Sequence, residues 1–230
     1  MTNNISELFS RIAPSYDKLN HLLSFSQDKR WRKLMIDAIT PKLSLRVVDL
    51  CAGTLDCTVA LLRKFPQAEI VAADFSQEML DRGMEKVPHV FQNHVSIQCV
   101  DALQMELPPR SVDVVLCAYG MRNIPDQSAM LRKIHTWLAP GGELIILEFF
   151  RPRTRLARFF SNTYSKYILP TIGGLVSGDK QAYSYLHASI QEFYSLPAYR
   201  ALLAQCGFHI VRDEDLTGGI TSLIVATPIL

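Results

Sequence analysis

The sequence predicts an α/β fold built on a mostly parallel β-sheet that is covered by helices on both faces. Short and almost continuously apolar segments alternate with helix-like segments from about residue 46 to residue 149. Polar residues, most of them aspartates, stand at the ends of these apolar segments. Strands that are buried on both faces are apolar throughout, and their alternation with helices is typical of parallel sheets. The length of 230 residues suits one such domain with additions.

Five parallel strands are expected first. They are residues 45–50, 69–74, 95–100, 112–118 and 143–149. The helices expected between them cover residues 58–65, 76–86 and 128–138. Pro66 should end the first helix, Ser76 should cap the second, and Pro140-Gly141-Gly142 should end the third.

Two more strands are expected near the end of the sequence, at residues 209–213 and 222–227. A helix at residues 199–206 precedes them, and the short turn at residues 217–219 joins them. A turn this short predicts an antiparallel hairpin that closes the sheet edge. The expected sheet therefore has seven strands, five of them parallel.

The remaining segments are expected to cover the sheet. Residues 1–40 are predicted to form a helical lid, and residues 41–230 form the main domain. Within that domain, residues 150–191 are helix-like and rich in tyrosine, which predicts an insertion over the substrate site. Parallel sheets bind ligands at the carboxyl ends of their strands, so the lid and the insertion should lie above that edge.

The composition argues against several functional classes. The net charge is only +2, so no overall field favours nucleic acid. The five cysteines are odd in number and include no C-x-x-C pair, so neither a disulfide framework nor a metal site is predicted. The first ten residues do not resemble a secretory signal, and no apolar run is long enough to span a bilayer. A cytoplasmic protein with reduced thiols is expected.

The loop after the first strand predicts the cofactor. It reads Asp49-Leu50-Cys51-Ala52-Gly53-Thr54-Leu55-Asp56. A dinucleotide site needs a glycine-rich G-x-G-x-x-G loop that approaches a diphosphate, whereas this loop has one glycine between two carboxylates. Acids suit the ammonium and sulfonium groups of S-adenosylmethionine, Gly53 permits close backbone approach, and Thr54 offers a hydroxyl.

Two further strand ends complete the predicted cofactor site. Asp74 can accept hydrogen bonds from ribose hydroxyls, and Asp101-Ala102 can hold the adenine amine. The alternative is that acids at strand ends only cap helices or face water. Three acids at three successive strand ends, beside a glycine turn, favour the cofactor site.

The sequence resembles the UbiE/MenG family of quinone-biosynthesis C-methyltransferases along nearly its whole length. The most specific shared segments are Tyr16-Asp17-x-x-Asn20, Gly120-Met121-Arg122-Asn123, Leu169-Pro170-x-Ile172-Gly173 and Tyr183-x-Tyr185-Leu186-x-x-Ser189-Ile190. The chain departs from the family pattern at Leu55, where the family has glycine, and at Ala118 in the cofactor site, where a small polar residue is usual.

The resemblance implies the class I methyltransferase fold and S-adenosylmethionine as methyl donor. It also implies methylation of a ring carbon on a polyprenylated quinol, either demethylmenaquinol or 2-polyprenyl-6-methoxy-1,4-benzoquinol. We expect Arg122 to stabilise negative charge on the ring oxygen, Asn123 to orient that oxygen, and Tyr16 to supply another hydrogen bond. The alternative for Arg122 is a structural ion pair with Asp17 or Glu148.

The segment at residues 151–160 carries a second signal. On a helical wheel Arg151, Arg155 and Arg158 gather on one side, and Leu156, Phe159 and Phe160 gather on another. This pattern predicts transient contact with the inner face of a membrane, or else a solvated helix face.

Three other functions stay open on sequence alone. These are a Rossmann oxidoreductase, a methyltransferase for another small molecule or a protein, and a catalytically silent binding protein. Leu55 is the best argument for the last. The sequence leaves the ring type, the prenyl length, and the choice between a monomer and a homodimer undecided.

Overall fold

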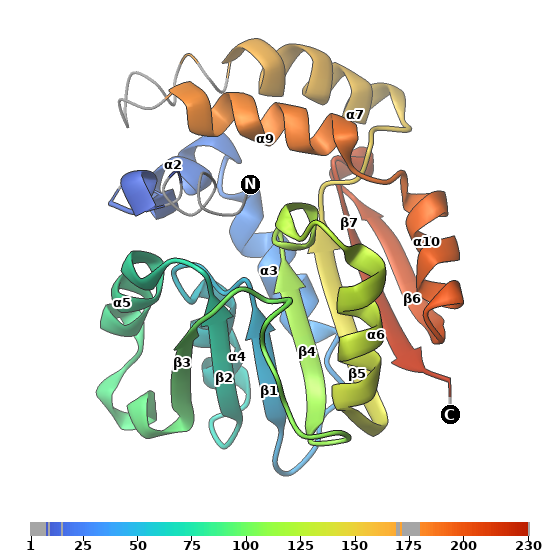
Figure 1. Cartoon of the computed structure of the whole chain (residues 1–230). Helices are drawn as coiled ribbons and strands as arrows, with labels where there is room; N and C mark the ends of the chain where they lie inside the picture. The colour runs from blue at the N-terminus through green and yellow to red at the C-terminus, as the bar shows by residue number, and fades with distance from the viewer. Residues whose placement is uncertain (1–7, 9, 15, 169–170, 172–179, 230) are drawn as a thin grey trace.

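A seven-stranded sheet runs through the centre of the protein in the order β3-β2-β1-β4-β5-β7-β6 (Figure 1). The computed structural model describes residues 8, 10–14, 16–168, 171 and 180–229. Strands β1 to β5 are parallel, and β7 is antiparallel to both of its neighbours. The predicted parallel sheet with a closing hairpin is confirmed. The strands are β1 Arg46–Leu50, β2 Glu69–Asp74, β3 Val95–Cys99, β4 Val112–Ala118, β5 Leu138–Glu148, β6 Phe208–Leu216 and β7 Thr221–Pro228.

Helices pack on both faces of this sheet. One apolar cluster joins α6 Gln127–Trp137 and α10 Leu196–Gln205 to the first face. A second cluster joins α3 Gln27–Asp37, α4 Asp56–Lys64 and α5 Gln77–Lys86 to the other face. Val48 belongs to the first cluster and Val47 to the second, because successive side chains of a strand point to opposite faces.

Local hydrogen bonds explain where the helices begin. The Asp126 carboxylate accepts a bond of 2.8 Å from the Ala129 amide and so caps α6. Ser76 caps α5 in the predicted way, by accepting a bond of 3.3 Å from the Met79 amide. Unpaired amides in the first turn of a helix need such acceptors.

Strand β5 begins earlier than predicted, at Leu138 instead of Glu143. Leu138 pairs with Val112, and the register then shifts before Val114 pairs with Glu143. The segment around Gly141, which has φ of 70°, therefore lies within an irregular part of the strand. Glycine adopts this left-handed backbone without steric cost.

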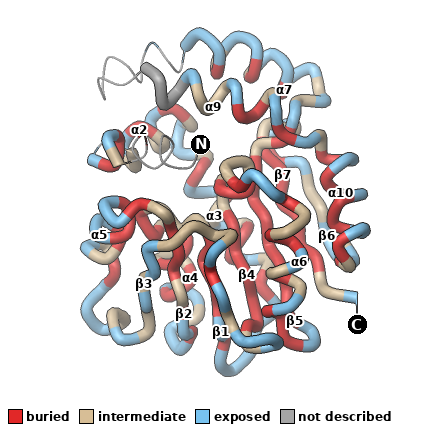
Figure 2. The backbone as a smooth tube through the Cα atoms, in the orientation of Figure 1, coloured by how far each residue is buried: buried red, intermediate tan, exposed pale blue. Residues whose placement is uncertain are grey.

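Helical segments of the described chain lie above the carboxyl ends of the parallel strands (Figure 1). The Tyr164 hydroxyl donates a hydrogen bond of 2.8 Å to the Leu23 carbonyl, so the N-terminal segment and the insertion contact each other. The outer surfaces of these segments are largely exposed, in contrast to the buried central strands β1, β4 and β5 (Figure 2). Most of the motif at residues 169–173 lies outside the described residues. These segments include α2 Tyr16–Leu23, α7 Arg155–Phe159, the π-helical η3 Phe160–Ile168 and α9 Lys180–Glu192.

Helix α3 packs into the core of the sheet. Its Trp31, Met35 and Ile36 side chains are buried in the second apolar cluster. The Trp31 indole also donates a hydrogen bond of 2.9 Å to Thr217 Oγ1, in the short helix η4 Thr217–Gly219 that joins β6 to β7. Across the described part of the chain, no helix combines the length and apolar character needed to cross a bilayer.

Candidate active site

A cavity of about 380 Å³ lies between the strand ends and the helices above them. The loops after β1, β2, β4 and β5 form its floor, while α2, α7, η3 and α9 contribute to its walls. Predicted site residues in its lining are Tyr16, Gly53, Asp74, Ala118, Arg122 and Asn123. The structure therefore brings together residues that are more than a hundred positions apart in the sequence.

A smaller cleft of about 20 Å³ adjoins this cavity. Asp101 and Ala102 line it, as expected for residues that follow β3. Asn123 and Asp74 border both the cleft and the cavity. A ligand that occupied both spaces would therefore pass along these two residues.

The Asp74 carboxylate holds the cofactor loop in place. One of its oxygens accepts a hydrogen bond of 2.9 Å from the Gly53 amide, and the other accepts one of 3.0 Å from the Ser76 amide. Burial raises the pKa of Asp74, and the backbone hydrogen bonds oppose that shift. Gly53 has φ of 52°, and a Cβ at this position would meet nothing within 4 Å. The loop thus presents open space to a ligand beside a buried acid.

The cavity also lacks unpaired basic groups in the described part of its lining. Its basic side chains are Arg32, which pairs with Asp28 and Asp56, and Arg122, which pairs with Glu148. A diphosphate would therefore find no free cation there, whereas a ligand with a sulfonium and an ammonium fits the acidic loop.

Asp49 and Thr54 do not line either space, although both are predicted cofactor residues. The buried Asp49 carboxylate accepts a hydrogen bond of 2.7 Å from Thr58 Oγ1 on α4. Burial raises the pKa of Asp49 to about 6. Thr54 Oγ1 donates a bond of 2.5 Å to Asp17 of α2. Both side chains thus support the cofactor loop without lining the cavity or the cleft.

Leu55 also points away from the cavity. Its backbone is left-handed, with φ of 60°, and its side chain is fully buried in the second apolar cluster. It lies against Gly83 of α5, where an added Cβ would stand 2.3 Å from Leu55 Cγ. Glycine adopts a left-handed backbone readily, whereas a leucine in this conformation is under local strain.

Arg122 forms the ion pair with Glu148 that the sequence left as an alternative. Both side chains are almost fully buried, and Glu148 Oε2 also accepts a hydrogen bond of 3.2 Å from the Arg122 amide. Burial raises the pKa of Glu148, and the Arg122 charge opposes the shift. Asp17 pairs instead with Lys86, at 2.7 Å. Arg122 nevertheless lines the cavity, so the ion pair and a contact with ligand are compatible.

Tyr16 extends from α2 into the cavity lining. Burial raises the pKa of its hydroxyl above the ordinary value. The hydroxyl therefore keeps its proton near neutral pH and is suited to donate a hydrogen bond.

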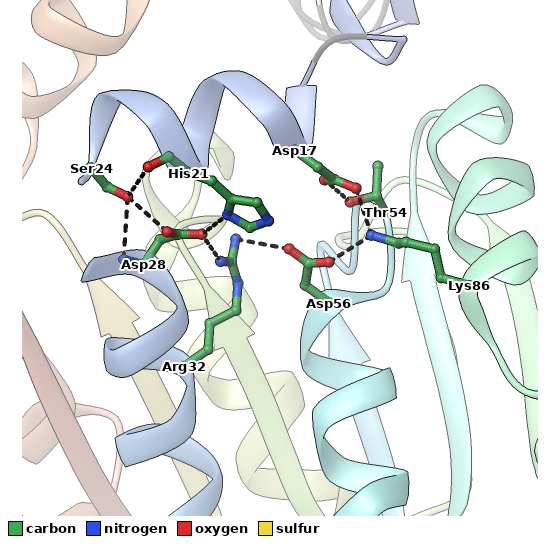
Figure 3. Close-up of polar contacts among 8 residues, drawn as sticks. All are labelled: Asp17, His21, Ser24, Asp28, Arg32, Thr54, Asp56 and Lys86. Carbon is green, nitrogen blue, oxygen red and sulfur yellow. Dashed lines mark hydrogen bonds and ion pairs between the residues drawn. The ribbon is translucent and has the colours of Figure 1, made fainter. Parts of the chain in front are cut away.

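A polar network joins α2 to the cofactor loop, and sequence reasoning missed most of it (Figure 3). Lys86 of α5 bridges Asp17 and Asp56 at 2.7 and 2.6 Å. Arg32 of α3 bridges Asp56 and Asp28 at 3.5 and 2.6 Å. In the sequence, the one feature that predicts part of this network is the four-residue spacing of Asp28 and Arg32, which allows an ion pair on a single helix.

Aromatic side chains give the cavity its apolar character. Tyr119 stacks on Phe149 with ring centroids 4.7 Å apart, and Trp31 packs edge-on against Phe149. Phe25 and Phe159 line the cavity but are 78% and 65% exposed, so they mark its mouth. A polar site with an apolar opening suits a ligand with a polar head and a lipophilic tail.

Known proteins match this chain over almost its full length. The model of the ubiE/COQ5 methyltransferase family matches residues 1–227. A demethylmenaquinone methyltransferase of Thermus thermophilus is 39% identical, with 95% of this chain and 98% of the relative covered. A ubiquinone/menaquinone biosynthesis C-methyltransferase UbiE of Syntrophotalea carbinolica is 36% identical, with 94% and 90% covered.

A similarity among solved structures agrees with the fold. The structure of a SAM-dependent methyltransferase from Aquifex aeolicus matches with a TM-score of 0.57 at 17% identity, covering 80% of this chain and 82% of that one. The resemblance seen in the sequence motifs is thus confirmed by the family model and by relatives matched over nearly their whole length. This chain belongs to the ubiE/COQ5 methyltransferase family.

Proposed function

We propose that this protein transfers the methyl group of S-adenosylmethionine to a ring carbon of a polyprenylated quinol in menaquinone or ubiquinone biosynthesis. One observation carries the proposal: a single cavity joins the cofactor loop, the polar pair Arg122 and Asn123, and an apolar mouth. The names of the two relatives describe proteins of this activity.

The proposed cofactor residues lie along the strand ends. Asp74 would accept hydrogen bonds from the ribose, Gly53 would let the backbone approach the ligand, and Asp101 with Ala102 would hold the adenine. Ala118 lines the cavity at the end of β4, where the methionine part would lie. When bound, S-adenosylmethionine supplies an electrophilic methyl group on a sulfonium. Asp49 and Thr54 would act by keeping the loop in shape.

The proposed chemistry needs a ring carbon made nucleophilic by loss of a proton from the neighbouring hydroxyl. Negative charge then develops on the ring oxygen, and donors fixed in an apolar site stabilise it. Arg122 and Asn123 would supply these donors, and Tyr16 would add a third from α2. Arg122 uses one N–H for Glu148 and one for Ser189, and a guanidinium has five. The Glu148 ion pair therefore orients Arg122 and leaves donors for a ring oxygen.

The proposed covering elements are α2 and the insertion at residues 150–191. Both contribute to the cavity wall. Helix α3 lines the cavity too, but its Met35 and Ile36 side chains pack in the core on the sheet, so this helix is part of the main domain. Of the predicted lid at residues 1–40, we therefore assign the covering role to the part before α3.

We also propose transient docking of the cavity mouth on an anionic membrane surface. Leu156 and Phe159 are 50% and 65% exposed, and Arg155 and Arg158 beside them are also exposed. Exposed apolar groups next to cations suit the interface of an acidic bilayer, and the isoprenoid tail could then stay in the lipid. Vesicle flotation with and without anionic lipid tests this. Binding that Phe159→Ser weakens is expected, and no binding to either vesicle would refute the idea.

The activity is tested with labelled S-adenosylmethionine and two demethylated quinols, one naphthoquinol and one benzoquinol. We expect label in the ring of at least one quinol, and Asn123→Ala should reduce the amount of label transferred. Normal cofactor binding without transfer to either quinol would refute the proposed function.

A further inference from the structure

We infer that Tyr185 of helix α9 is a positioning residue that fixes the direction of the Asn123 amide in the active site. The inference rests on the proposed function, because the role of Asn123 belongs to that proposal. It assigns to the insertion a part in catalysis beyond covering the cavity.

The contact joins residues far apart in the chain. The Tyr185 hydroxyl donates a hydrogen bond of 2.8 Å to Asn123 Oδ1, across a separation of 62 residues. Both residues line the cavity, and Asn123 also borders the smaller cleft. Tyr185 is half-buried, so the protein partly shields this hydrogen bond from water. Burial raises the pKa of Tyr185, which keeps the hydroxyl protonated as a donor.

The bond determines what Asn123 offers to a ligand. An amide side chain has one acceptor oxygen and an NH₂ group with two donors, and the two ends have nearly the same shape. With its oxygen bound to a hydroxyl donor, Asn123 presents the NH₂ group. Donors stabilise a ring oxygen that is losing its proton, whereas an acceptor would repel it. The direction of this amide therefore matters for the reaction.

The same helix also contacts the neighbouring arginine. Arg122 Nε donates a hydrogen bond of 3.3 Å to Ser189 Oγ, one turn further along α9. The Ser189 hydroxyl donates in turn to the Leu186 carbonyl at 3.0 Å, so its oxygen faces Arg122 as an acceptor. Glu148 of β5 binds the same guanidinium. Helix α9 thus orients both polar residues of η2 Met121–Asn123.

The first test is a double-mutant cycle between Tyr185→Phe and Asn123→Ala. Tyr185→Phe removes only the hydroxyl. We expect kcat to fall by about tenfold, because a lost orienting hydrogen bond is worth about 1.4 kcal/mol in the transition state. Cofactor affinity by calorimetry and the melting temperature should stay near the wild-type values. In the Asn123→Ala background the same change should cost less than about twofold, since the residue that Tyr185 acts on is gone.

Tyr167→Phe is the matched control. Tyr167 is also in the insertion, but it is exposed and does not line the cavity. Its kcat should equal that of the wild type. Equal losses from Tyr185→Phe in both backgrounds, or no loss in either, would overturn the inference.

A second measurement does not depend on turnover. The side-chain amide signals of Asn123 in a ¹⁵N NMR spectrum are identified by their disappearance in Asn123→Ala. They should shift in Tyr185→Phe and not in Tyr167→Phe. Unshifted signals would refute the contact. Shifted signals in a protein inactive on both quinols would leave the contact intact and refute the proposed function.

Discussion

Replacing Gly83 of α5 with alanine tests how this protein tolerates leucine in its cofactor loop. The Cβ of an alanine would stand 2.3 Å from Leu55 Cγ and 2.8 Å from Leu55 Cβ. Neither atom is the free end of a flexible side chain, so α5 or the loop would have to move. The expected result is that the two positions are strongly coupled in stability.

The magnitudes follow from packing and backbone conformation. Overpacking costs about 1–3 kcal/mol, and alanine regains about 1 kcal/mol over glycine in a helix, so Gly83→Ala alone should lose about 0–2 kcal/mol. Leu55→Gly alone loses about 2–5 kcal/mol of core packing and regains about 1–2 kcal/mol from the left-handed backbone. In the double variant the clash is absent, and alanine at position 83 should instead gain about 1 kcal/mol. The expected coupling is therefore about 1–3 kcal/mol, which is the overpacking cost itself.

Urea unfolding of the wild type, the two single variants and the double variant measures this coupling. Effects that add within about 0.5 kcal/mol would refute the reasoning, because additivity means that the two side chains do not meet. The same proteins test whether Leu55 affects the cofactor. Since Leu55 points away from the cavity, Leu55→Gly should change the Kd for S-adenosylmethionine by less than about threefold.

Three further predictions concern charged side chains. Asp49 holds its proton more tightly in the folded protein than in the unfolded one, so its stabilising contribution is present below the ordinary pKa of 3.8 and is lost as pH rises through about 6. Asp49→Asn should therefore gain about 3 kcal/mol relative to wild type between about pH 4 and pH 7 in urea unfolding, and parallel curves would contradict this. Glu148→Gln leaves Arg122 buried without its counter-charge and should lower the unfolding free energy by about 3 kcal/mol, whereas an unchanged urea midpoint would rule out the buried pair. Lys86→Gln removes the bridge between Asp17 and Asp56. Tryptic cleavage at the exposed Lys18 should then become several-fold faster, with little change in melting temperature. Equal cleavage rates in the variant and the wild type would argue against a role for this bridge in holding α2.

Short-range sequence patterns were enough to predict the sheet and the residues at its strand ends. The apolar run before Asp74 and the loop at Gly53 are local features, and parallel strands bring their carboxyl ends to one edge. The alternation of side chains along a strand also predicts the orientation of Asp49. Residues 47 and 49 share a face of β1, and Val47 packs on the side of α4. Strand alternation therefore pointed Asp49 at Thr58 and away from the ligand.

Short-range sequence patterns could not predict the contacts that complete the site. Tyr185 meets Asn123 across 62 residues, and Arg32 meets Asp56 because α3 packs beside α4. Neither pairing has a periodic signal, because it depends on how separate helices dock. The strain at Leu55 is similar, since only the docked α5 reveals that Gly83 makes room for that side chain.

The hydrogen bond between Trp31 and Thr217 has a consequence for the synthesis and folding of the chain itself. A ribosome that has made α3 must add about 180 further residues before the partner of the Trp31 indole exists. Thr217 and Ile220 also line the cavity, so its wall is completed only after the turn between β6 and β7 has been synthesised. A nascent chain that stalled before that turn would carry the cofactor loop and every strand of the parallel sheet, yet would expose an unfinished apolar pocket to chaperones and proteases.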